Sequence, residues 1–238
     1  IITELYKTIG MELKIRLSVH DPERMEKYLG TEAVWNESES MLKSMLEEQS
    51  VLYEIGVGEA AFYGPKLDYI GIDSIGRQWQ LATIQLDTNQ PERFKLGFIN
   101  EKGQEERPVM VHVAVMGSVE RFMGVLIEHL AGAFPVWLAP VQVALLPVSE
   151  KFVDFAATVE KKFKSAGVRV AVDASDESVG KKIRNAEKEK IPYMIVLGEK
   201  EVDGENISVR QRGVKDQYSL SLDAFIEKVQ KEIQERKK

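Results

Sequence analysis

Cysteine is absent from the 238-residue sequence, so disulfide bonds and thiolate metal sites are excluded. No apolar run is long enough to cross a membrane, and no secretory signal, internal repeat or low-complexity segment is visible. These absences exclude a disulfide-rich secreted domain and a membrane span. We therefore expect a cytoplasmic protein with no membrane partner. Because the first residue is Ile1 rather than methionine, we also expect a piece of a longer protein.

Charge is unevenly distributed along the chain. Hydrophobic residues make up 44% and charged residues 29% of the sequence, as in ordinary globular proteins, and the net charge is −6. Residues 1–142 hold 13 Lys and Arg against 21 Asp and Glu, a balance of −8, whereas residues 143–238 hold 19 against 17, a balance of +2. The C-terminal part is therefore the better candidate for binding a polyanion.

Short strands joined by turns dominate residues 1–139 and predict an α+β domain, with an antiparallel sheet backed by helices. The apolar spacing predicts a helix end at 2–9, strands at 13–19 and 51–55, a helix over 35–46, a hairpin of 66–72 and 77–87 around Ser74-Ile75-Gly76, and a turn at 100–103. The loop that ends at Gly64-Pro65 either brings Tyr63 close to a ligand or is simply a tight turn between strands.

The stretch from 107 to 130 combines a strand with a helix. Valines occupy the odd positions from Val109 to Val115, which predicts a strand buried on its valine face. Ser118 is a good N-cap for the amphipathic helix that follows. Arg121, in the first turn of that helix, has two interpretations that the spacing leaves open. It binds an anion at the helix start, or it pairs with a carboxylate such as Glu120 or Glu92.

Residues 140–238 show a different pattern, which begins at a predicted domain boundary at Ala139-Pro140. Strands are predicted at 141–148, 168–173 and 192–197, helices at 150–166 and 179–190, edge strands at 207–210 and 217–220, and a closing helix at 223–235. Because strands alternate with helices, we expect an α/β domain with parallel strand pairs.

Three polar residues in the 77–87 strand suit a small polar ligand: Gln80, Thr83 and Gln85. In a regular strand Gln80 and Gln85 point to opposite faces, so both reach one pocket only through a bulge or across the strand end. His112 shares its strand face with methionines and has no second metal ligand nearby in the sequence. Considered alone, it indicates a core histidine rather than a zinc site.

The sequences of several segments resemble those of a known protein family. A strand followed by Gly-Ser-hydrophobic-Glu-Arg-Phe and an amphipathic helix resembles motif 3 of the class II aminoacyl-tRNA synthetases. Five further strings resemble threonyl-tRNA synthetases in the same order: GEAAFYGPKLDY (58–69), GRQWQLATIQLD (76–87), PERF (91–94), RPVMVH (107–112) and AGAFPVWLAPVQV (131–143). The resemblance runs in register from about Glu4 to the C-terminus.

This resemblance implies roles for residues of the first domain. The threonine pocket falls on Tyr63, Lys66 and Gln85. The ATP site falls on Gln80, Thr83, Ser118 and Arg121, with Arg121 on the triphosphate as the catalytic residue. His112 matches one of three zinc ligands in the family. Leu81, Thr88 and Val113 stand where many members have cysteine, an aromatic residue and arginine.

In the second domain, the resemblance implies a mixed five-stranded sheet that binds the tRNA anticodon through Asp176, Glu201 and Arg210. The family often has asparagine at the position of Asp176. An aspartate there accepts hydrogen bonds from a guanine edge but repels phosphates. Glu201 and Arg210 also suit a cross-strand ion pair, and the two roles are compatible. We expect Lys181 and Lys182 to contact phosphates.

The resemblance predicts threonine–tRNA ligation. Threonine and ATP, with Mg²⁺, give threonyl-adenylate and pyrophosphate, and the acyl group then passes to tRNA. This sequence has no counterpart of the other two zinc ligands, of the motif 2 arginine or of motif 1. Because the family dimerises through motif 1, the parent protein is expected to be a homodimer. The alternative is a non-catalytic RNA-binding paralogue or an engineered fragment.

Overall fold

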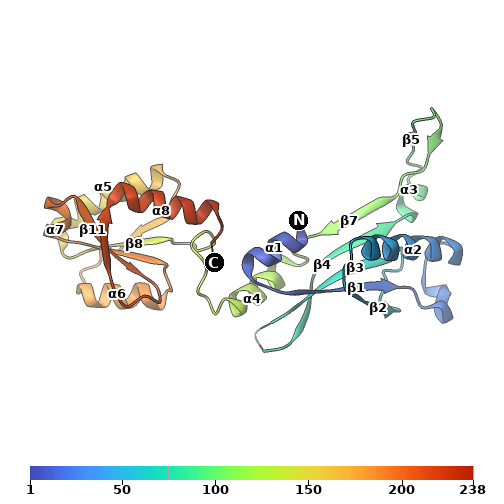
Figure 1. The fold of residues 1–238 in the computed structure, drawn as a ribbon, viewed down its shortest axis with the longest axis horizontal. Coiled ribbons are helices and arrows are strands. Elements are labelled where there is room, and N and C mark those ends of the chain that lie inside the picture. Colours follow the sequence, from blue (N-terminus) through green and yellow to red (C-terminus); the bar gives the residue numbers. More distant parts are fainter. Residues whose placement is uncertain (74, 238) are drawn as a thin grey trace. The chain divides into compact units, whose positions relative to one another are not determined.

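The computed structural model describes residues 1–73 and 75–237 and consists of two compact units, Ile1–His129 (unit 1) and Leu130–Lys238 (unit 2). Figure 1 labels the helices and strands of both units. Within the described residues, no helix combines the length and the apolar character that a membrane span needs. The cytoplasmic location stays a prediction.

Unit 1 is built on a five-stranded sheet with the strand order β2-β1-β3-β4-β7. The strands are β1 (Leu13–Val19), β2 (Tyr53–Val57), β3 (Lys66–Ile72), β4 (Gln78–Asp87) and β7 (Met110–Ala114). All neighbours are antiparallel except β1 and β2, which are parallel. The predicted antiparallel pairing is confirmed for β1, β3, β4 and β7, and the edge strand β2 is the exception. The 17-residue helix α2 (Glu32–Glu48) carries the chain back to the start of β2, and such a crossover produces a parallel pair.

Helices cover part of this sheet. Besides α2, unit 1 contains α1 (Ile2–Ile9), α3 (Asn89–Arg93), α4 (Val119–His129) and the 3₁₀ segment η1 (Pro22–Lys27). Tyr6 of α1 is fully buried and meets Phe122 of α4 edge to face, with ring centroids 5.9 Å apart. The Tyr6 hydroxyl donates to the carbonyl oxygen of Val115 at 3.1 Å. This contact fastens α1 to the end of the β7 segment.

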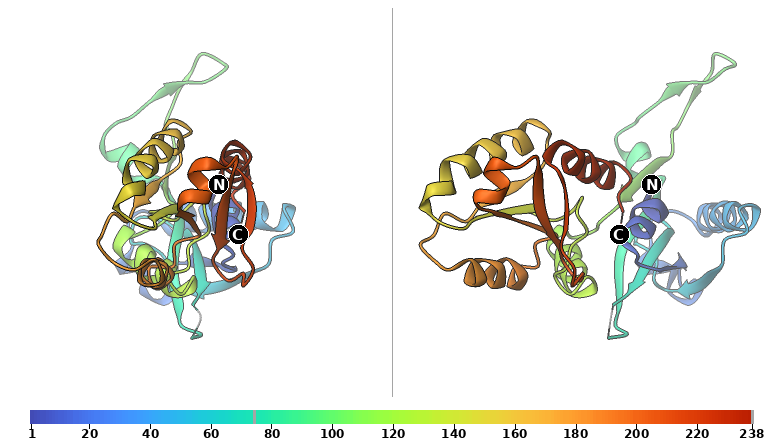
Figure 2. Two further views of the ribbon diagram at one scale, coloured as in Figure 1. Left: turned by 90° about the vertical axis from the view of Figure 1, so that its left-hand side faces the viewer. Right: turned by 60° about the vertical axis from the view of Figure 1, so that its left-hand side comes forward.

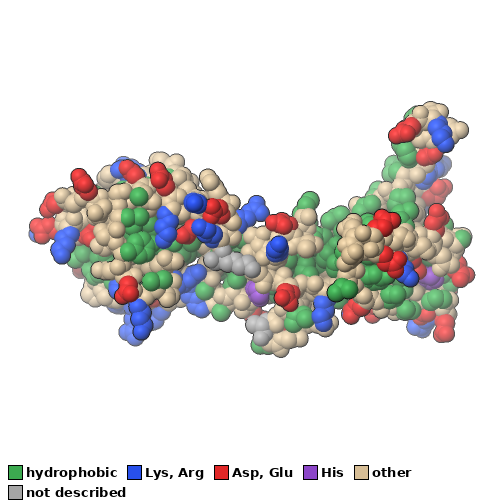
Figure 3. All heavy atoms as spheres, viewed as in Figure 1, with side chains coloured by type: hydrophobic (Ala, Val, Ile, Leu, Met, Phe, Trp, Pro, Cys, Tyr) green, Lys and Arg blue, Asp and Glu red, His purple; other side chains and the backbone are tan. Residues whose placement is uncertain are grey.

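Two hairpins match their predicted positions. The β3–β4 hairpin is confirmed, although Ser74 in its predicted turn lies outside the described residues. The short strands β5 (Phe98–Ile99) and β6 (Glu105–Glu106) form the second hairpin, in which Asn100 Oδ1 accepts the Lys102 and Gln104 backbone N–H groups at 2.9 Å. Figure 2 shows this hairpin projecting from the rest of unit 1, and Figure 3 shows hydrophobic side chains along its stem.

The predicted burial of the valine face on β7 is wrong. Val109, Val111 and Val113 are 51%, 53% and 56% exposed, whereas His112 and its neighbours on the other face are half-buried. Val111 is in register with Leu86, so the valines continue a face that is buried at the centre of the sheet. Because β7 is the last strand in the sheet order, its valines lie at the edge, where they are left exposed.

Unit 2 contains the predicted mixed five-stranded sheet, with the order β12-β11-β10-β8-β9. The strands are β8 (Val143–Pro147), β9 (Val170–Val172), β10 (Tyr193–Leu197), β11 (Asn206–Gln211) and β12 (Tyr218–Ser221). β8 is parallel to both β9 and β10, and the remaining pairs are antiparallel. The prediction that 207–210 forms an edge strand is wrong, because β12 covers the outer side of β11.

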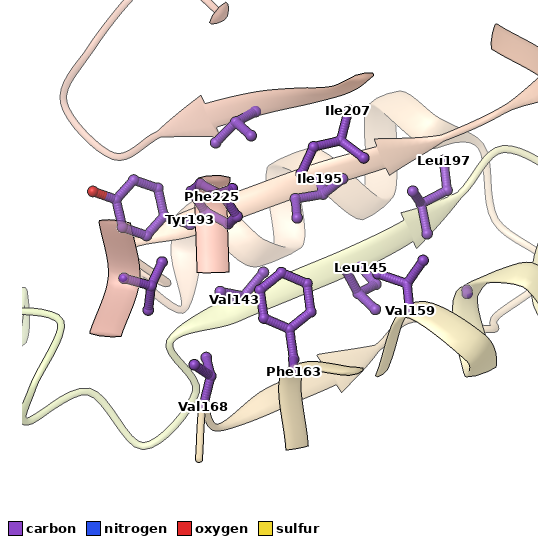
Figure 4. Close-up of a cluster of buried hydrophobic side chains, with 13 residues drawn as sticks. Val143, Leu145, Val159, Phe163, Val168, Tyr193, Ile195, Leu197, Ile207 and Phe225 are labelled. Atoms are coloured by element: carbon purple, nitrogen blue, oxygen red, sulfur yellow. The ribbon is translucent and has the colours of Figure 1, made fainter. Parts of the chain in front are cut away.

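The two faces of this sheet are packed by different helices (Figure 1). The helices are α5 (Val153–Ser165), which follows the 3₁₀ turn η2 (Glu150–Phe152), α6 (Val179–Lys188), the short α7 (Glu199–Asp203) and α8 (Leu222–Gln234). Figure 4 shows the larger core cluster, in which Phe163 of α5, Phe225 of α8 and Tyr193 of β10 meet edge to face. A smaller cluster lies on the other face, where Ala186 of α6 packs near Met194.

The segment before β8 is held to unit 2 by side chains that donate to its carbonyl oxygens. Gln142 Nε2 donates to Val136 at 2.8 Å, and Arg169 donates to Ala139 and Trp137 at 2.9 and 2.8 Å. The Arg212 guanidinium donates to Phe134 at 2.7 Å and to Ala133 at 3.2 Å. This segment therefore belongs to unit 2, and the domain boundary at Ala139-Pro140 stays a prediction.

Candidate functional sites

One face of the unit 1 sheet carries polar side chains from four adjacent strands. We call it the ligand face, and its residues are Ser18, Lys66, Asp68, Gln80, Thr83, Gln85, Asp87 and His112. In the strand register, Lys66 is opposite Gln85, Asp68 is opposite Thr83, and Gln85 is opposite His112. Opposite residues project to the same side of a sheet, so the register gathers these groups on one surface.

A β-bulge at Leu81 places Gln80 on the ligand face. Tyr69 is paired with Ala82, but the next residue, Ile70, is paired with Gln80, so Leu81 is the extra residue. The bulge reverses the alternation between positions 80 and 82. Gln80 and Gln85 therefore lie on the same side of the sheet. In the alternating sequence pattern, both side chains could reach one pocket only through such a bulge or across the strand end.

A buried carboxylate, Asp68, organises one end of the ligand face. It is 3% exposed and accepts three hydrogen bonds: from Ser18 Oγ at 2.7 Å, from Lys66 Nζ at 2.8 Å and from Gln80 Nε2 at 2.6 Å. Sequence reasoning identified Lys66 and Gln80 but missed Asp68 and Ser18. The available signal was an acidic residue in the middle of the otherwise apolar strand KLDYIGI.

A second buried carboxylate, Asp87, organises the other end. Its Oδ2 atom lies 3.0 Å from His112 Nε2, and its Oδ1 atom accepts the backbone N–H groups of Asn89 and Gln90 at 2.9 Å. The Tyr63 hydroxyl donates to Gln85 Oε1. Burial and the nearby Asp87 charge raise the pKa of Tyr63, so the phenol stays protonated and remains a donor.

Close packing explains why the loop before β3 contains Gly64. A Cβ atom on this residue would lie 1.8 Å from the carbonyl oxygen of Leu86, so only glycine fits against β4. Asn89 Nδ2 also donates to the carbonyl oxygen of Tyr63 at 2.7 Å. Together these contacts hold the Tyr63 ring 5.9 Å from the His112 ring, measured between centroids. The loop is a tight turn, in which the Gly64 N–H donates to the Ala61 carbonyl oxygen at 3.3 Å, and it also places Tyr63 beside Gln85. Its role in binding a ligand stays a prediction.

The hydrogen bonds leave a defined set of groups for a ligand. Because an ionised Asp68 only accepts, Gln80 must donate its amide N–H, and its carbonyl oxygen stays available. Gln85 accepts from Tyr63 through its oxygen, so its NH₂ group stays available. Thr83 Oγ1 is buried and has no partner within the described part of the chain. A free acceptor, a free donor and an unpartnered hydroxyl on one face suit a small polar ligand.

The predicted N-cap at Ser118 is confirmed, since its Oγ accepts the backbone N–H of Arg121 at 3.3 Å. Glu120 accepts the Ser118 hydroxyl at 2.9 Å, and Glu92 pairs with Arg107 at 3.0 Å. Arg121 makes no ion pair with any described residue, so the alternative that it pairs with Glu120 or Glu92 is wrong.

Arg121 lies beside the bulge. A Cβ atom on Gly117 would approach both the Leu81 carbonyl oxygen, at 3.0 Å, and Arg121 Nη2, at 3.4 Å. Burial raises the pKa of Tyr6 to about 12, and the Arg121 charge acts in the opposite direction, which also places the guanidinium near this end of the sheet. A free guanidinium at a helix N-terminus suits an anionic ligand.

His112 is the predicted zinc ligand among the described residues. They contain no cluster of three or more His, Asp or Glu side chains arranged to hold a metal ion. If His112 donates Nε2–H to Asp87, its Nδ1 lone pair remains free to bind a metal. A single imidazole nevertheless falls short of the three protein ligands of a catalytic zinc site.

In unit 2, the predicted ion pair between Glu201 and Arg210 is wrong. The Glu201 carboxylate accepts from Ser208 Oγ at 2.7 Å and from the Gly198 backbone N–H at 3.1 Å, where it caps α7. Arg210 makes no ion pair with residues 1–73 or 75–237. It lines a pocket of about 410 Å³ between α6 and the end of β11, and its side chain is therefore available to a ligand.

Asp176 and the two lysines of α6 occupy different environments. Asp176 is exposed in the loop between β9 and α6, as a base-contacting residue must be. Lys181 is exposed and pairs with Glu177 at 2.5 Å. Lys182 is only 3% exposed, so the prediction that it contacts phosphate is wrong. The start of α6 packs Lys182 against the sheet, where its ammonium group donates to the Pro147 carbonyl oxygen.

Family models match both parts of this chain. The tRNA synthetase class II core domain (G, H, P, S and T) matches residues 1–130, and an anticodon binding domain matches residues 142–232. The chain therefore belongs to the class II tRNA synthetase family.

Named relatives narrow the comparison and confirm the resemblance to threonyl-tRNA synthetases. Threonine–tRNA ligase of Chlorobium phaeobacteroides is 48% identical over 98% of this chain, and that of Prosthecochloris aestuarii is 46% identical over the same share. The chain spans 35% and 36% of the lengths of these two relatives.

Solved structures give the same result. The RNA binding domain of threonyl-tRNA synthetase from Cryptosporidium parvum superposes with a TM-score of 0.89 at 37% identity, covering 97% of this chain and 57% of that one. A putative threonyl-tRNA synthetase from Aeropyrum pernix superposes with a TM-score of 0.72 at 30% identity, covering 94% and 55%.

Proposed function

We propose that a protein containing this chain joins threonine to tRNA in two steps. Threonine and ATP form threonyl-adenylate and pyrophosphate, and the threonyl group then passes to the end of the tRNA. The observation that carries the proposal is the ligand face, where all the residues expected to hold threonine and ATP from β3 and β4 point to one side. The threonine–tRNA ligases with which the chain shares 46–48% identity support the choice of amino acid.

Tyr63, Lys66 and Gln85 are assigned to the amino acid. The charge of Lys66 is balanced by Asp68 at 2.8 Å, so this part of the site is close to neutral and does not repel the ammonium group of threonine. Gln85 offers its free NH₂ group to an oxygen of the substrate.

Gln80, Thr83, Ser118 and Arg121 are assigned to ATP. The unpaired Arg121 would bind the triphosphate, which carries its own Mg²⁺, and would stabilise negative charge on the departing pyrophosphate. The unpartnered hydroxyl of Thr83 provides a further hydrogen-bonding group beside Gln80. His112 is assigned to zinc, but only in a protein that supplies further ligands. A homodimeric parent is likewise proposed from the family resemblance alone.

Unit 2 is assigned to the anticodon. Arg210 at its pocket and Asp176 in its exposed loop provide a donor and an acceptor for base edges. Both Glu201 oxygens are already used, so Glu201 acts by accepting an additional hydrogen bond or by holding Ser208 in place.

RNA binding by the 238-residue chain tests this assignment directly. The probes are an anticodon stem-loop with a threonine anticodon and a second loop with the same bases in scrambled order. We expect tighter binding of the first, and we expect Arg210→Ala to weaken it by about 1–3 kcal/mol. Arg236→Ala is the charge-matched control in the exposed tail. Equal affinity for the two loops at moderate salt would overturn the assignment.

Threonine-dependent ATP–pyrophosphate exchange tests the activation step. We expect exchange by a protein of the relatives' full length and none by the 238-residue chain, which has one imidazole for the metal and no recognisable arginine for the α-phosphate. Each missing electrostatic contact typically costs about 2.7–4 kcal/mol of transition-state stabilisation. Robust exchange by the short chain, abolished in Arg121→Ala, would show that these residues form a complete site.

The alternative is a non-catalytic RNA-binding protein. One observation favours it: the anticodon binding domain model matches residues 142–232, nearly all of unit 2, whereas the described residues hold no complete metal site. Specific RNA binding without exchange in the full gene product would select this alternative.

A further inference from the structure

Lys182 is the buried cation in the described part of unit 2, and the catalytic proposal does not use it. Its side chain runs from the first turn of α6 to the ends of two parallel strands. The ammonium group donates to the carbonyl oxygen of Pro147, the last residue of β8, and to that of Asp173, which follows β9, both at 3.0 Å. Lys182 therefore ties together β8, β9 and α6.

The local hydrogen bonds explain why a lysine is needed there. Asp173 N–H donates to the Leu145 carbonyl oxygen at 3.0 Å, and a continued parallel ladder would bring the Ser175 N–H to Pro147. The chain turns away instead, because Ser175 N–H donates to the Asp173 side chain at 3.1 Å. Pro147 is left without its ladder donor, and Lys182 takes that place.

This arrangement sets the path of the six-residue loop 173–178. Lys182 and the Asp173 turn hold its first residue, and the carbonyl oxygen of Ser178 at its other end accepts the Lys181 and Lys182 backbone N–H groups at 2.9 and 3.0 Å. Asp176 lies between these fixed ends and is exposed. A loop this short leaves Asp176 few alternative positions once both ends are held.

We propose that Lys182 is a positioning residue for RNA recognition: it keeps the 173–178 loop off the β8–β9 edge and so presents Asp176 to a base of the bound RNA. The role rests on the proposed anticodon-binding function of unit 2. Without the ammonium group, the buried carbonyl oxygen of Pro147 and the partly buried one of Asp173 lose their donor. The Pro147 carbonyl oxygen is then open to the Ser175 N–H, and an exchange of its Asp173 acceptor for Pro147 extends β9 and moves Asp176.

Lys182→Met, which keeps the length of the side chain and removes the ammonium group, is the primary test. We expect the affinity of the chain for the threonine-anticodon stem-loop to fall by about 5-fold or more, as for one lost base contact. Affinity for the scrambled loop and the dependence of binding on salt should stay unchanged, because a buried lysine releases no counterion. The matched control is Lys181→Met, which removes an exposed ion pair to the same loop. As a predicted phosphate contact, Lys181 should affect the affinity for both stem-loops alike, so the ratio of the two affinities stays unchanged.

A double-mutant cycle separates positioning from general stability. If Lys182 acts through Asp176, then Asp176→Ala lowers affinity in the unmodified chain but changes it by less than about 2-fold in the Lys182→Met background. Additive effects, or no effect of Asp176→Ala in the unmodified chain, would overturn the proposal. Amide hydrogen exchange provides a second readout, with loss of protection expected at 173–178 and not in β10 or β11.

The cysteine-free sequence allows a rescue experiment if Lys182→Met fails to fold. Lys182→Cys can be alkylated in denaturant with 2-bromoethylamine or with 1-bromopropane and then refolded. The two products have the same number of heavy atoms and differ by an ammonium or a methyl group at the tip. Discrimination restored only by the aminoethyl product supports the role, and equal behaviour of the two products contradicts it. If the unmodified chain does not discriminate between the loops, the proposed function fails first.

Discussion

The two units use buried charge in opposite ways. In unit 1 the buried charged groups are carboxylates, Asp68, Asp73 and Asp87, and each collects hydrogen bonds from side chains. Among the described residues of unit 2 the buried charged group is a cation, Lys182, which donates to backbone carbonyl oxygens. The half-buried Arg212 and the exposed Arg169 donate to carbonyl oxygens in the same way.

The difference follows from what each charge can bind. A carboxylate is surrounded by donors, so it fixes their rotamers and decides which of their atoms stay free. Around Asp68 and Asp87 the side-chain donors belong to the ligand face, and around Asp73 they are Arg77 and Trp79. A cation collects acceptors, and carbonyl oxygens that lack a ladder partner are the ones available in unit 2. The carboxylates of unit 1 therefore fix the orientations of side chains, whereas the cations of unit 2 fix the course of the backbone.

The largest effect should come from Asp68. Asp68→Ala leaves Lys66, whose side chain is 13% exposed, without its partner. We expect the free energy of unfolding of unit 1 to fall by about 3–5 kcal/mol, the usual result of breaking a buried ion pair. Urea unfolding followed by the fluorescence of Trp35 and Trp79 measures it. The double variant Asp68→Asn with Lys66→Met should lose less, and a larger loss would contradict the pairing argument.

Arg212→Ala tests the cations of unit 2. Three carbonyl oxygens, those of Lys190, Ala133 and Phe134, lose a donor, and we expect unit 2 to lose about 2 kcal/mol of stability. The matched variant is Arg210→Ala, two residues away on the same chain, which should change stability by less than about 0.5 kcal/mol. Equal losses in circular-dichroism melts of the two variants would remove the distinction between a structural and a ligand-binding arginine.

Acid should affect unit 1 through Asp73. Burial acts to raise the pKa of this carboxyl group, but hydrogen bonds from Trp79 and Arg77 outweigh it, so the pKa lies below its usual value. A lowered pKa contributes stability above the unfolded value, about 3.9, and the contribution is lost as pH falls toward the folded value. We expect Asp73→Asn to flatten the fall in melting temperature of unit 1 between pH 5 and 2.5. An unchanged slope would show that other carboxyl groups control acid unfolding.

The smallest effect should come from an exposed pair. Arg16 and Glu54 lie 2.8 Å apart on β1 and β2, but their side chains are 29% and 52% exposed. We expect Glu54→Ala to change the stability of unit 1 by less than about 0.5 kcal/mol, because solvent screens such pairs. A loss near that of Asp68→Ala would mean that burial does not explain the contrast between the units.

The sequence pattern predicted most of the helices and strands, but not which face of each one is buried. The sequence pattern of 13–19, 66–72 and 192–197 was enough to place strands, and Ser118 was enough to place the start of α4. Alternation separates the two faces of a strand without saying which face is buried, and this ambiguity produced the error on β7. The short elements α3 and α7, of five residues each, are below the length at which periodicity is informative.

For the ligand face, the residue pattern pointed to Gln80, Thr83 and Gln85 and the resemblance added Lys66, while Asp68 and Asp87 emerged only when the strands were paired. No local signal links Asp68 to Ser18, which lies 50 positions earlier in the chain. Likewise, Lys182 shares the spacing of Val179, Ile183 and Ala186 on α6, but only the structure shows that its ammonium group is buried against the sheet while Lys181 is exposed.

Local preferences therefore account for the elements, their order and the class of each domain, because hydrophobic period and capping act within a few residues. Strand pairing, the bulge at Leu81 and the burial of Asp68 and Lys182 depend on contacts between residues far apart in the chain. Burial decides whether a charged side chain contacts solvent or organises its neighbours, because an unpaired charge is costly only where water is excluded.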